Sequence, residues 1–285
     1  MPRQAKLTHK MRKAVLNATS RKKQDNMMCY TNTTTATPTG SADYTLRPAT
    51  LVGSQQGSDV ITRTPYVFPF CPTARNLVNN AQLPNSIVNE AQRTATTCYM
   101  VGYKESIEIQ ISDGCPWQWR RIVVTARGNV AGLLTGPNEP VFLDTTTGEG
   151  MLRSVNNISG NRNQGSMFAL FQVLFEGQNS SDWTDPMTAN LDRHSFHVLS
   201  DKVRTLSSGN EQGMIRKFKT YVPLNKNLQY DDDETGETTS TTYMSVNTGE
   251  GLGNLYIFDL FRARYGNSTS NLWFSPQGKL YWHEK

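Results

Sequence analysis

This sequence lacks long apolar runs, closely spaced cysteines and any acidic residue in its first 24 positions. Its longest apolar run, residues 167–175, is about half the length of a membrane-spanning helix. The four cysteines lie at least 17 residues apart, so no pair has the close spacing of a zinc or redox site. The first 24 residues also lack the apolar core of a secretory signal. We therefore expect a soluble, intracellular chain with reduced cysteines.

Catalytic and metal-binding signatures are missing as well. The sequence has no phosphate-binding glycine loop, no G-x-S-x-G turn and no H-E-x-x-H helix. His194 and His197 are close in sequence, but a spacing of three places them on opposite faces of a strand. The acidic cluster at residues 231–237 lacks the ligand positions of an EF-hand loop. It is typical of a solvated hairpin tip, and the alternative is a cation or interface contact. We expect no enzyme activity, no cofactor and no metal ion.

Positive charge is concentrated at one end of the chain. The sequence has 29 Lys+Arg against 24 Asp+Glu, a net charge of +5. Eight of the basic residues fall within residues 1–24, which leaves a net charge of −3 for the remainder. A basic arm of this kind indicates a polyanionic partner, and the absence of aromatic residues before Tyr30 favours nucleic acid over a membrane. The candidate nucleic-acid-binding residues of the arm are Arg3, Lys6, Lys10, Arg12, Lys13, Arg21, Lys22 and Lys23.

The arm contains two shorter signals. Apolar residues at helical spacing predict a short helix over residues 7–18. The basic clusters at residues 10–13 and 21–23 resemble a bipartite nuclear import signal, made of Lys10, Arg12, Lys13, Arg21, Lys22 and Lys23. A polar, Thr-rich linker follows at residues 31–41. We therefore predict a flexible arm and linker at residues 1–41 and one folded domain at residues 42–285.

From residue 97 onward the pattern is that of a β protein. Residues 99–111 alternate between two faces, as in a half-buried strand. Further strands are predicted at residues 117–126, 151–155, 167–175, 195–206, 214–222, 241–246, 254–265 and 280–282. Helices are predicted only weakly, at residues 73–81 and 183–193. Eight or nine strands joined by long, turn-rich loops predict an antiparallel sandwich or barrel.

Two basic segments lie within the predicted strands. Their candidate nucleic-acid-binding residues are Trp117, Trp119, Arg120, Arg121, Arg216, Lys217 and Lys219. Aromatic rings stack on bases and cations contact phosphates, so such residues could guide a single strand. The alternative is that the tryptophans belong to the core and that the cations only extend to solvent.

The order of these features resembles that of small icosahedral virus coat proteins. Segments Thr97-Cys-Tyr-Met-Val-Gly-Tyr-Lys-Glu105 and Trp117-Gln-Trp-Arg-Arg-Ile122 are similar to those of genomovirus capsid proteins. These proteins form the shells of small circular single-stranded DNA viruses. Residues 194–202, Arg216-Lys-Phe218 and Tyr256-Ile-Phe258 are more distantly similar, in the same order, to geminivirus coat proteins.

The resemblance implies an all-β fold, an eight-stranded antiparallel jelly-roll sandwich with long loops and a basic N-terminal arm. It also implies that about 60 copies close a small icosahedral, T=1-like shell. The arm would hold a circular single-stranded DNA genome by phosphate contacts. The other expected partner is a host nuclear import receptor, with no membrane, and the expected locations are the virion and the host cell nucleus. The alternative is a non-capsid β-sandwich protein that binds nucleic acid or glycan and uses the arm for targeting.

Overall fold

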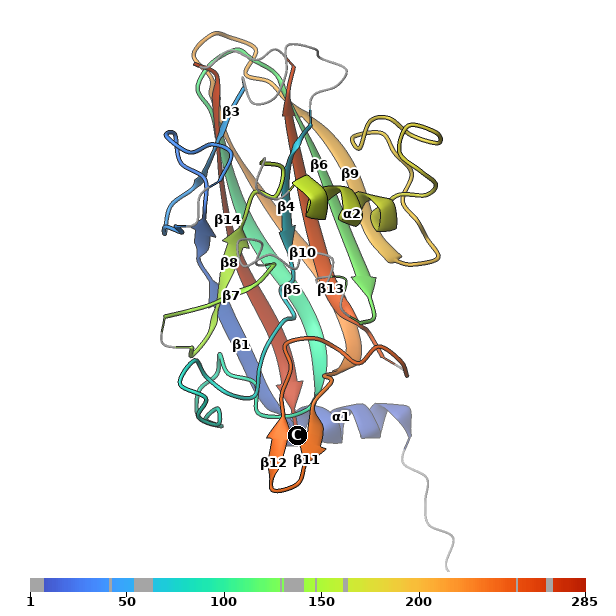
Figure 1. Ribbon diagram of the computed structural model, residues 1–285. Helices are drawn as coiled ribbons and strands as arrows, with labels where there is room; N and C mark the ends of the chain where they lie inside the picture. The colour runs from blue at the N-terminus through green and yellow to red at the C-terminus, as the bar shows by residue number, and fades with distance from the viewer. Residues whose placement is uncertain are drawn as a thin grey trace, which may run out of the picture.

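A computed structural model describes residues 8–40, 43–53, 64–128, 130, 141–146, 148–160, 164–249, 251–264 and 269–285. Its main feature is a sandwich of two antiparallel sheets (Figure 1). The first sheet consists, in spatial order, of β1 (Arg21–Met27), β14 (Asn271–Glu284), β5 (Thr97–Ile111) and β10 (Met214–Gln229), and β3 (Ala49–Val52) also pairs with β14. The second sheet consists of β4 (Tyr66–Phe70), β13 (Asn254–Ala263), β6 (Trp117–Ala126) and β9 (His197–Leu206).

Smaller elements surround the sandwich. Strands β2 (Cys29–Thr31), β8 (Met151–Val155) and β7 (Leu143–Asp144) form a three-stranded sheet, and β11 (Asp233–Thr235) pairs with β12 (Thr238–Ser240). Helix α1 (His9–Thr19) precedes β1, as the sequence predicts, and helix α2 (Gln164–Leu174) lies beside the second sheet (Figure 1). Neither helix is long and apolar enough to cross a membrane, and this holds for every helix among the described residues.

The strand order identifies the fold. When the eight long strands of the two main sheets are counted along the chain, the first sheet reads 1-8-3-6 and the second 2-7-4-5. Successive strands therefore cross from one sheet to the other, except at the β6–β9 pair. This is the arrangement of a jelly roll, in which two Greek-key sheets pack face to face. The predicted fold class is confirmed.

Four charged side chains divide the core between the sheets. Glu105, Arg121, Arg153 and Asp259 are each at most 4% exposed, and we call them the central charged cluster. Arg153 Nε donates to Glu105 Oε1 at 2.7 Å, and its Nη2 donates to Asp259 Oδ2 at 2.9 Å. Arg121 pairs with the same two carboxylates. Burial alone would raise the pKa of Glu105, but Arg121 and Arg153 hold it below the ordinary value.

Apolar residues fill the space on both sides of the central charged cluster. One apolar cluster contains Trp119 and Ile107, and the other contains Tyr103 and Val123. Two of these residues also donate hydrogen bonds to the central charged cluster. Tyr103 Oη donates to Glu105 Oε1 at 3.1 Å, and Trp119 Nε1 donates to Asp259 Oδ1 at 2.9 Å. The buried polar atoms of the cluster therefore have partners, as buried charges require.

Residues 167–174 belong to α2 and Phe175 forms only an isolated bridge, so the strand predicted at residues 167–175 is wrong. Met167, Leu170, Phe171 and Leu174 are buried and recur at the spacing of one helix face. A short run in which nearly every residue is apolar fits a strand and a buried helix equally well. The contacts decide, because α2 packs against the outer face of the second sheet in a third apolar cluster.

The folded domain begins earlier than the sequence predicts. Residues 21–27 form β1 and pair along their whole length with β14, so they are not part of a flexible arm. Thr31 and Thr33 of the predicted linker are fully buried, and Thr31 Oγ1 donates to the carbonyl oxygen of Val155 at 2.9 Å. The boundary between arm and domain therefore lies next to Arg21 rather than at residue 41. The sequence does not reveal this edge strand because two of its buried residues, Lys23 and Asp25, are charged, so no apolar alternation marks it.

Other local predictions also fail. Residues 73–81 and 183–193 form turns and isolated bridges rather than helices, and residues 241–246 contribute a single bridge rather than a strand. Strand β4 was missed because Pro69 interrupts its sequence pattern. Proline is tolerated there because β4 lies at the edge of its sheet.

We predict that Arg153→Met lowers the free energy of unfolding by about 3–5 kcal/mol, because it leaves two buried carboxylates short of a partner. Lys217→Gln is the matched control. It breaks the Lys217–Glu108 pair, in which the lysine side chain is 74% exposed, and should cost about 0–1 kcal/mol. Urea unfolding of the full chain measures both values. Equal costs for the two variants would contradict a structural role for the central charged cluster.

Candidate nucleic-acid interface

The two main sheets differ in what covers their outer faces. Helix α2 and the residues after it cover the second sheet, and the described residues place no comparable layer over the first. On the first sheet, buried residues alternate with solvent-facing ones in β1, β5 and β14. The outward side chains include five lysines, and we call this surface the lysine face. The five are Lys22, Lys104, Lys217, Lys219 and Lys279.

The lysine face carries little negative charge. Within β1, β5, β10 and β14, all of which the structure describes, Glu108 is the single outward-facing acid. It pairs with Lys217 at 3.0 Å. Lys279 lies opposite Lys104 in the strand register, so two cations are neighbours near the middle of the sheet. Like charges placed this closely repel each other unless an anion binds between them.

Aromatic side chains share this face with the lysines. Tyr99, Tyr221 and Tyr281 point outward, and Tyr221 is 55% exposed. His283 lies opposite both Lys22 and Tyr99 in the register. Partial burial and the nearby Lys22 lower the pKa of His283, so the imidazole is neutral at pH 7 and the positive charge comes from the lysines.

A β-bulge brings Tyr99 to this face. The alternation predicted over residues 99–111 places Tyr99 with Tyr103 and Ile107, on the core side. In the structure the register of β5 against β14 shifts at Val101, and Met100 is buried while Tyr99 is exposed. A bulge inserts one extra residue and so reverses the faces beyond it. Periodicity alone gives no sign of such an insertion.

Of the three cations predicted to bind nucleic acid from residues 216–219, two belong to the lysine face and the third does not. Lys217 and Lys219 point outward from β10. Arg216 is also exposed, but it alternates with them and lies on the other side of the strand. Lys104 and Lys279 were missed by the sequence analysis. The alternating pattern around Lys104 could have indicated its outward direction, but not the strands beside it.

Four predicted nucleic-acid-binding residues are buried in the folded domain, and that prediction is wrong for them. Trp117 and Trp119 are fully buried, and Arg120 and Arg121 are 3% and 4% exposed. The tryptophans pack between the sheets. Arg121 belongs to the central charged cluster, where its guanidinium is already paired. Strand β6 lies between β13 and β9 in the second sheet, and nine of its ten residues are buried.

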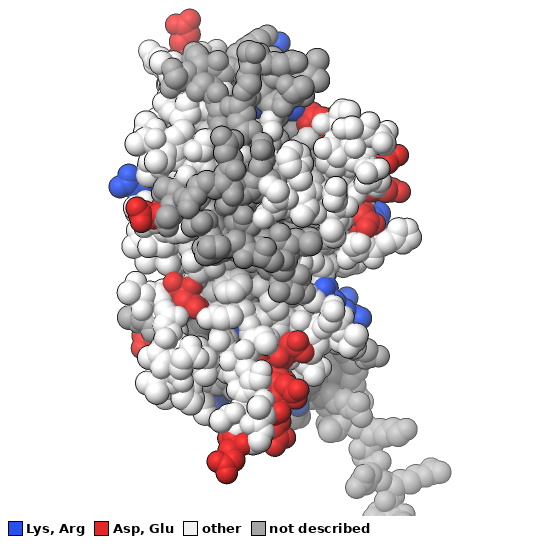
Figure 2. All heavy atoms as spheres, in the orientation of Figure 1, with Lys and Arg blue, Asp and Glu red and all other residues white. Residues whose placement is uncertain are grey.

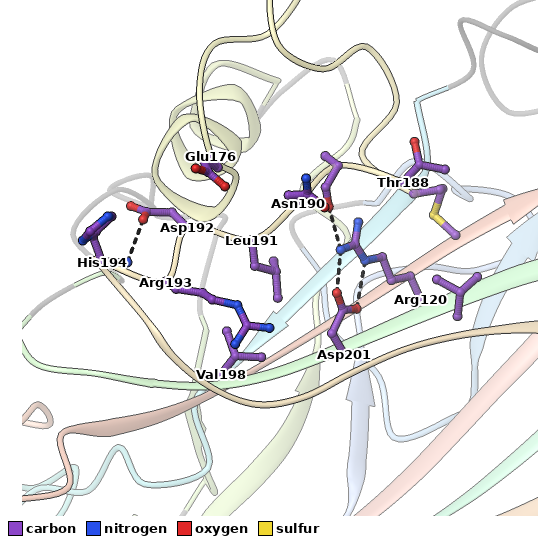
Figure 3. A pocket seen from close by; sticks show the side chains of 13 residues that line it. Arg120, Glu176, Thr188, Asn190, Leu191, Asp192, Arg193, His194, Val198 and Asp201 are labelled. Atoms are coloured by element: carbon purple, nitrogen blue, oxygen red, sulfur yellow. Dashed lines mark hydrogen bonds and ion pairs between the residues drawn. The ribbon is translucent and has the colours of Figure 1, made fainter.

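Arg120 lies at the bottom of a pocket of about 680 Å³ beside β9 (Figure 3). Its Nε and Nη2 donate to the two carboxylate oxygens of Asp201 at 3.0 and 2.7 Å. Nη1 donates to the backbone oxygen of Pro186 at 2.7 Å, and Nη2 also donates to that of Ala189 at 2.8 Å. Arg120 therefore fastens the segment after α2 to the second sheet. Four of its five N–H donors are therefore engaged within the protein, and its side chain is only 4% exposed.

The basic arm is placed only in part. Arg3 and Lys6 lie outside the described residues, and Lys10, Arg12 and Lys13 lie on α1 but their side chains are not described. Arg21 and Lys22 are exposed at the start of β1.

Lys23 is buried, and its Nζ donates to the backbone oxygens of Ile87 and Asn89 at 3.0 and 2.7 Å. Burial lowers its pKa. It is therefore unavailable to DNA or to an import receptor in the folded chain, and both predictions are corrected at this residue. Its neighbour Lys22 points the other way, because successive residues of a strand face opposite sides.

One group of acidic residues lies at the β11–β12 hairpin. Figure 2 shows Asp and Glu gathered at the lower end of that view, over the β11–β12 hairpin. Both strands of the hairpin are exposed, as predicted for a solvated tip. Asp232, next to it, is buried against Arg93 at 2.6 Å. Among the described residues, no three His, Cys, Asp or Glu side chains come together as metal ligands.

No protein-family model matches this chain, and no curated protein matches it. Among solved structures, it is similar to a chain of deformed wing virus carrying the GFP gene, at 11% identity and a TM-score of 0.26, over 82% of this chain and 72% of that one. VP1 of Trichodysplasia spinulosa-associated polyomavirus, in complex with 3'-sialyllactose, gives 10% identity and a TM-score of 0.22 over 93% of both chains. The fold is therefore assigned from the strand order of the two sheets and not from these similarities.

We predict that the lysine face contributes to the salt dependence of nucleic-acid binding. Replacing Lys22, Lys104, Lys219 and Lys279 by Gln should reduce the slope of log K against log salt for a single strand, by about 0.7 for each lysine that contacts a phosphate. Lys202→Gln, at an exposed lysine of β9 in the second sheet, is the control and should leave the slope unchanged. Binding titrations of the full chain at several salt concentrations measure the slopes. If the slope is the same in the four-lysine variant as in the unmodified chain, the lysine face does not contact the nucleic acid.

Proposed function

We propose that this chain is a structural capsid protein whose copies assemble into a small closed shell around circular single-stranded DNA. The observation that carries the proposal is a complete jelly roll whose bare sheet is basic and continues directly into a basic arm. Jelly rolls of eight strands are the building blocks of many viral capsids. A fold alone does not establish a function, so the argument also needs surfaces for self-association and for nucleic acid.

Two open sheet edges support self-association. β9 and β10 follow each other in the chain, and each ends its sheet without a further partner among the described strands. Large apolar side chains are exposed along them, including Val203 at 52% and Ile215 at 66%. Unpaired edges and exposed apolar residues are features that a soluble protein normally covers. Contact with further copies would cover them, in a closed arrangement such as a T=1 shell of about 60 chains.

The position of the arm supports a role in packaging. Helix α1 ends at Thr19 and β1 begins at Arg21, so the arm leaves the domain from the edge of the first sheet. Arg21 and Lys22, the first residues of β1, are exposed and link the arm's charge to the lysine face. Both elements then present cations to one polyanion, which they bind by neutralising phosphates without reading sequence.

We further propose that the protein is not an enzyme and that the arm directs nuclear import during assembly. Lys10, Arg12, Lys13, Arg21 and Lys22 would carry the import signal, because Lys23 is buried. The virion and the host cell nucleus are the corresponding locations.

Electron microscopy of purified protein tests assembly. We expect uniform closed particles, and the ultraviolet absorbance of the purified particles should show that they contain nucleic acid.

A variant lacking residues 1–20 should still form particles but lose most of the nucleic acid, because it keeps β1 and loses the arm. A variant lacking residues 1–27 should not fold, because β14 then loses the strand that pairs with it on the side away from β5.

Two results would contradict these proposals. Monomers at every salt and protein concentration would reject the shell and leave a non-capsid binding module. Particles of the shortened chain that retain their full nucleic-acid content would reject the role of the arm.

A further inference from the structure

A groove of about 520 Å³ crosses the lysine face at the end from which the arm leaves. Lys22 and Gln24 line it from β1, Tyr281 and His283 from β14, and Lys104 from β5. Tyr221 of β10 closes its far side. The groove therefore runs across all four strands of the first sheet and combines aromatic rings with cations.

Gly102 lies between two tyrosines that line the groove. Tyr281 lies opposite Gly102 on one side in the strand register. From the other side Tyr221 leans over the glycine, since a Cβ at this position would lie 2.5 Å from Tyr221 Oη and 2.7 Å from its Cζ. Any side chain at residue 102 would displace the ring. The absence of a side chain lets the tyrosines from β10 and β14 approach each other across β5.

Positive charge surrounds these rings. Lys104 lies opposite Tyr221 in the register of β5 and β10. Lys279 Nζ lies 5.4 Å from the ring centroid of Tyr281. Glu90 is the one acid that lines the groove among the described residues, and its Oε2 accepts a hydrogen bond from Gln24 Nε2 at 3.0 Å. The His283 ring lies 6.1 Å from that of Tyr99 and extends the aromatic surface past the end of the groove.

We propose that this groove binds unpaired bases of a single-stranded nucleic acid, which stack on Tyr221 and Tyr281 while Lys22, Lys104 and Lys279 contact the adjacent phosphates. A row of lysines alone would bind double-stranded and single-stranded nucleic acid equally. Exposed aromatic faces between lysines favour the single strand, because its bases are free to leave their neighbours and stack on protein. The proposal deepens the proposed function, since it gives packaging a preference for single strands that the arm's charge cannot supply.

The test compares two probes of equal length and charge, an oligothymidylate and an oligonucleotide whose sites are all abasic. The full-length chain should bind the oligothymidylate more tightly, and the arm contributes equally to both affinities. Tyr221→Leu and Tyr281→Leu should each weaken oligothymidylate binding about tenfold and leave abasic binding unchanged, because leucine keeps apolar bulk but not the stacking plane. Lys104→Gln should weaken binding of both probes by the same factor.

Phe168→Leu is the matched control, because Phe168 is an exposed aromatic residue of α2, on the side of the second sheet. It should change neither affinity. Equal binding of the two probes by the unmodified chain would overturn the proposal, and so would tyrosine variants that weaken both probes equally. Failure of the chain to form particles would reject the proposed shell, but it would leave the ratio of the two affinities, and so the groove, intact.

Discussion

The pairing of Glu105, Arg121, Arg153 and Asp259 in the middle of the sandwich is the constraint on which the rest of the structure depends. These residues come from β5, β6, β8 and β13, so one cluster joins the first sheet, the second sheet and the small sheet. In apolar surroundings a charge is tolerated only when its partner is in place, so a shift of either sheet would separate the charges at high cost. The cluster therefore fixes how the sheets face each other and which strand residues point outward.

The outer faces of the sandwich follow from this arrangement and are unequal. The second sheet is apolar on both sides, since Val67, Ile122 and Phe258 face outward and require the cover of α2. The first sheet has lysine and tyrosine at the equivalent outward positions and needs no cover. A protein that forms a shell around nucleic acid requires such a difference between faces. The bare sheet also carries the edge strand from which the arm leaves, so in the proposed shell its cations and those of the arm act on the same partner.

Sequence patterns predicted strands well where one face is buried and the chain is regular. Residues 117–126 and 151–155 were predicted with the observed bounds. The patterns failed where tertiary contacts replace periodicity. Residues 167–174 form a helix because the second sheet offers an apolar surface to one helix face. Tyr99 changes face because of a bulge, and the polar Thr31 is buried because Val155 accepts its hydrogen bond.

The all-β class and the concentration of positive charge in the arm can be read from the amino-acid sequence, because both depend on local composition and on spacings of a few residues. Only the tertiary structure decided which cations of the body are free to meet a polyanion. Arg121 and Lys104 are similar in sequence context, but Arg121 meets Asp259, 138 residues away, and Lys104 meets solvent. The reason is that the electrostatic state of a side chain depends on partners brought to it by strand pairing, and those partners lie far away in the chain.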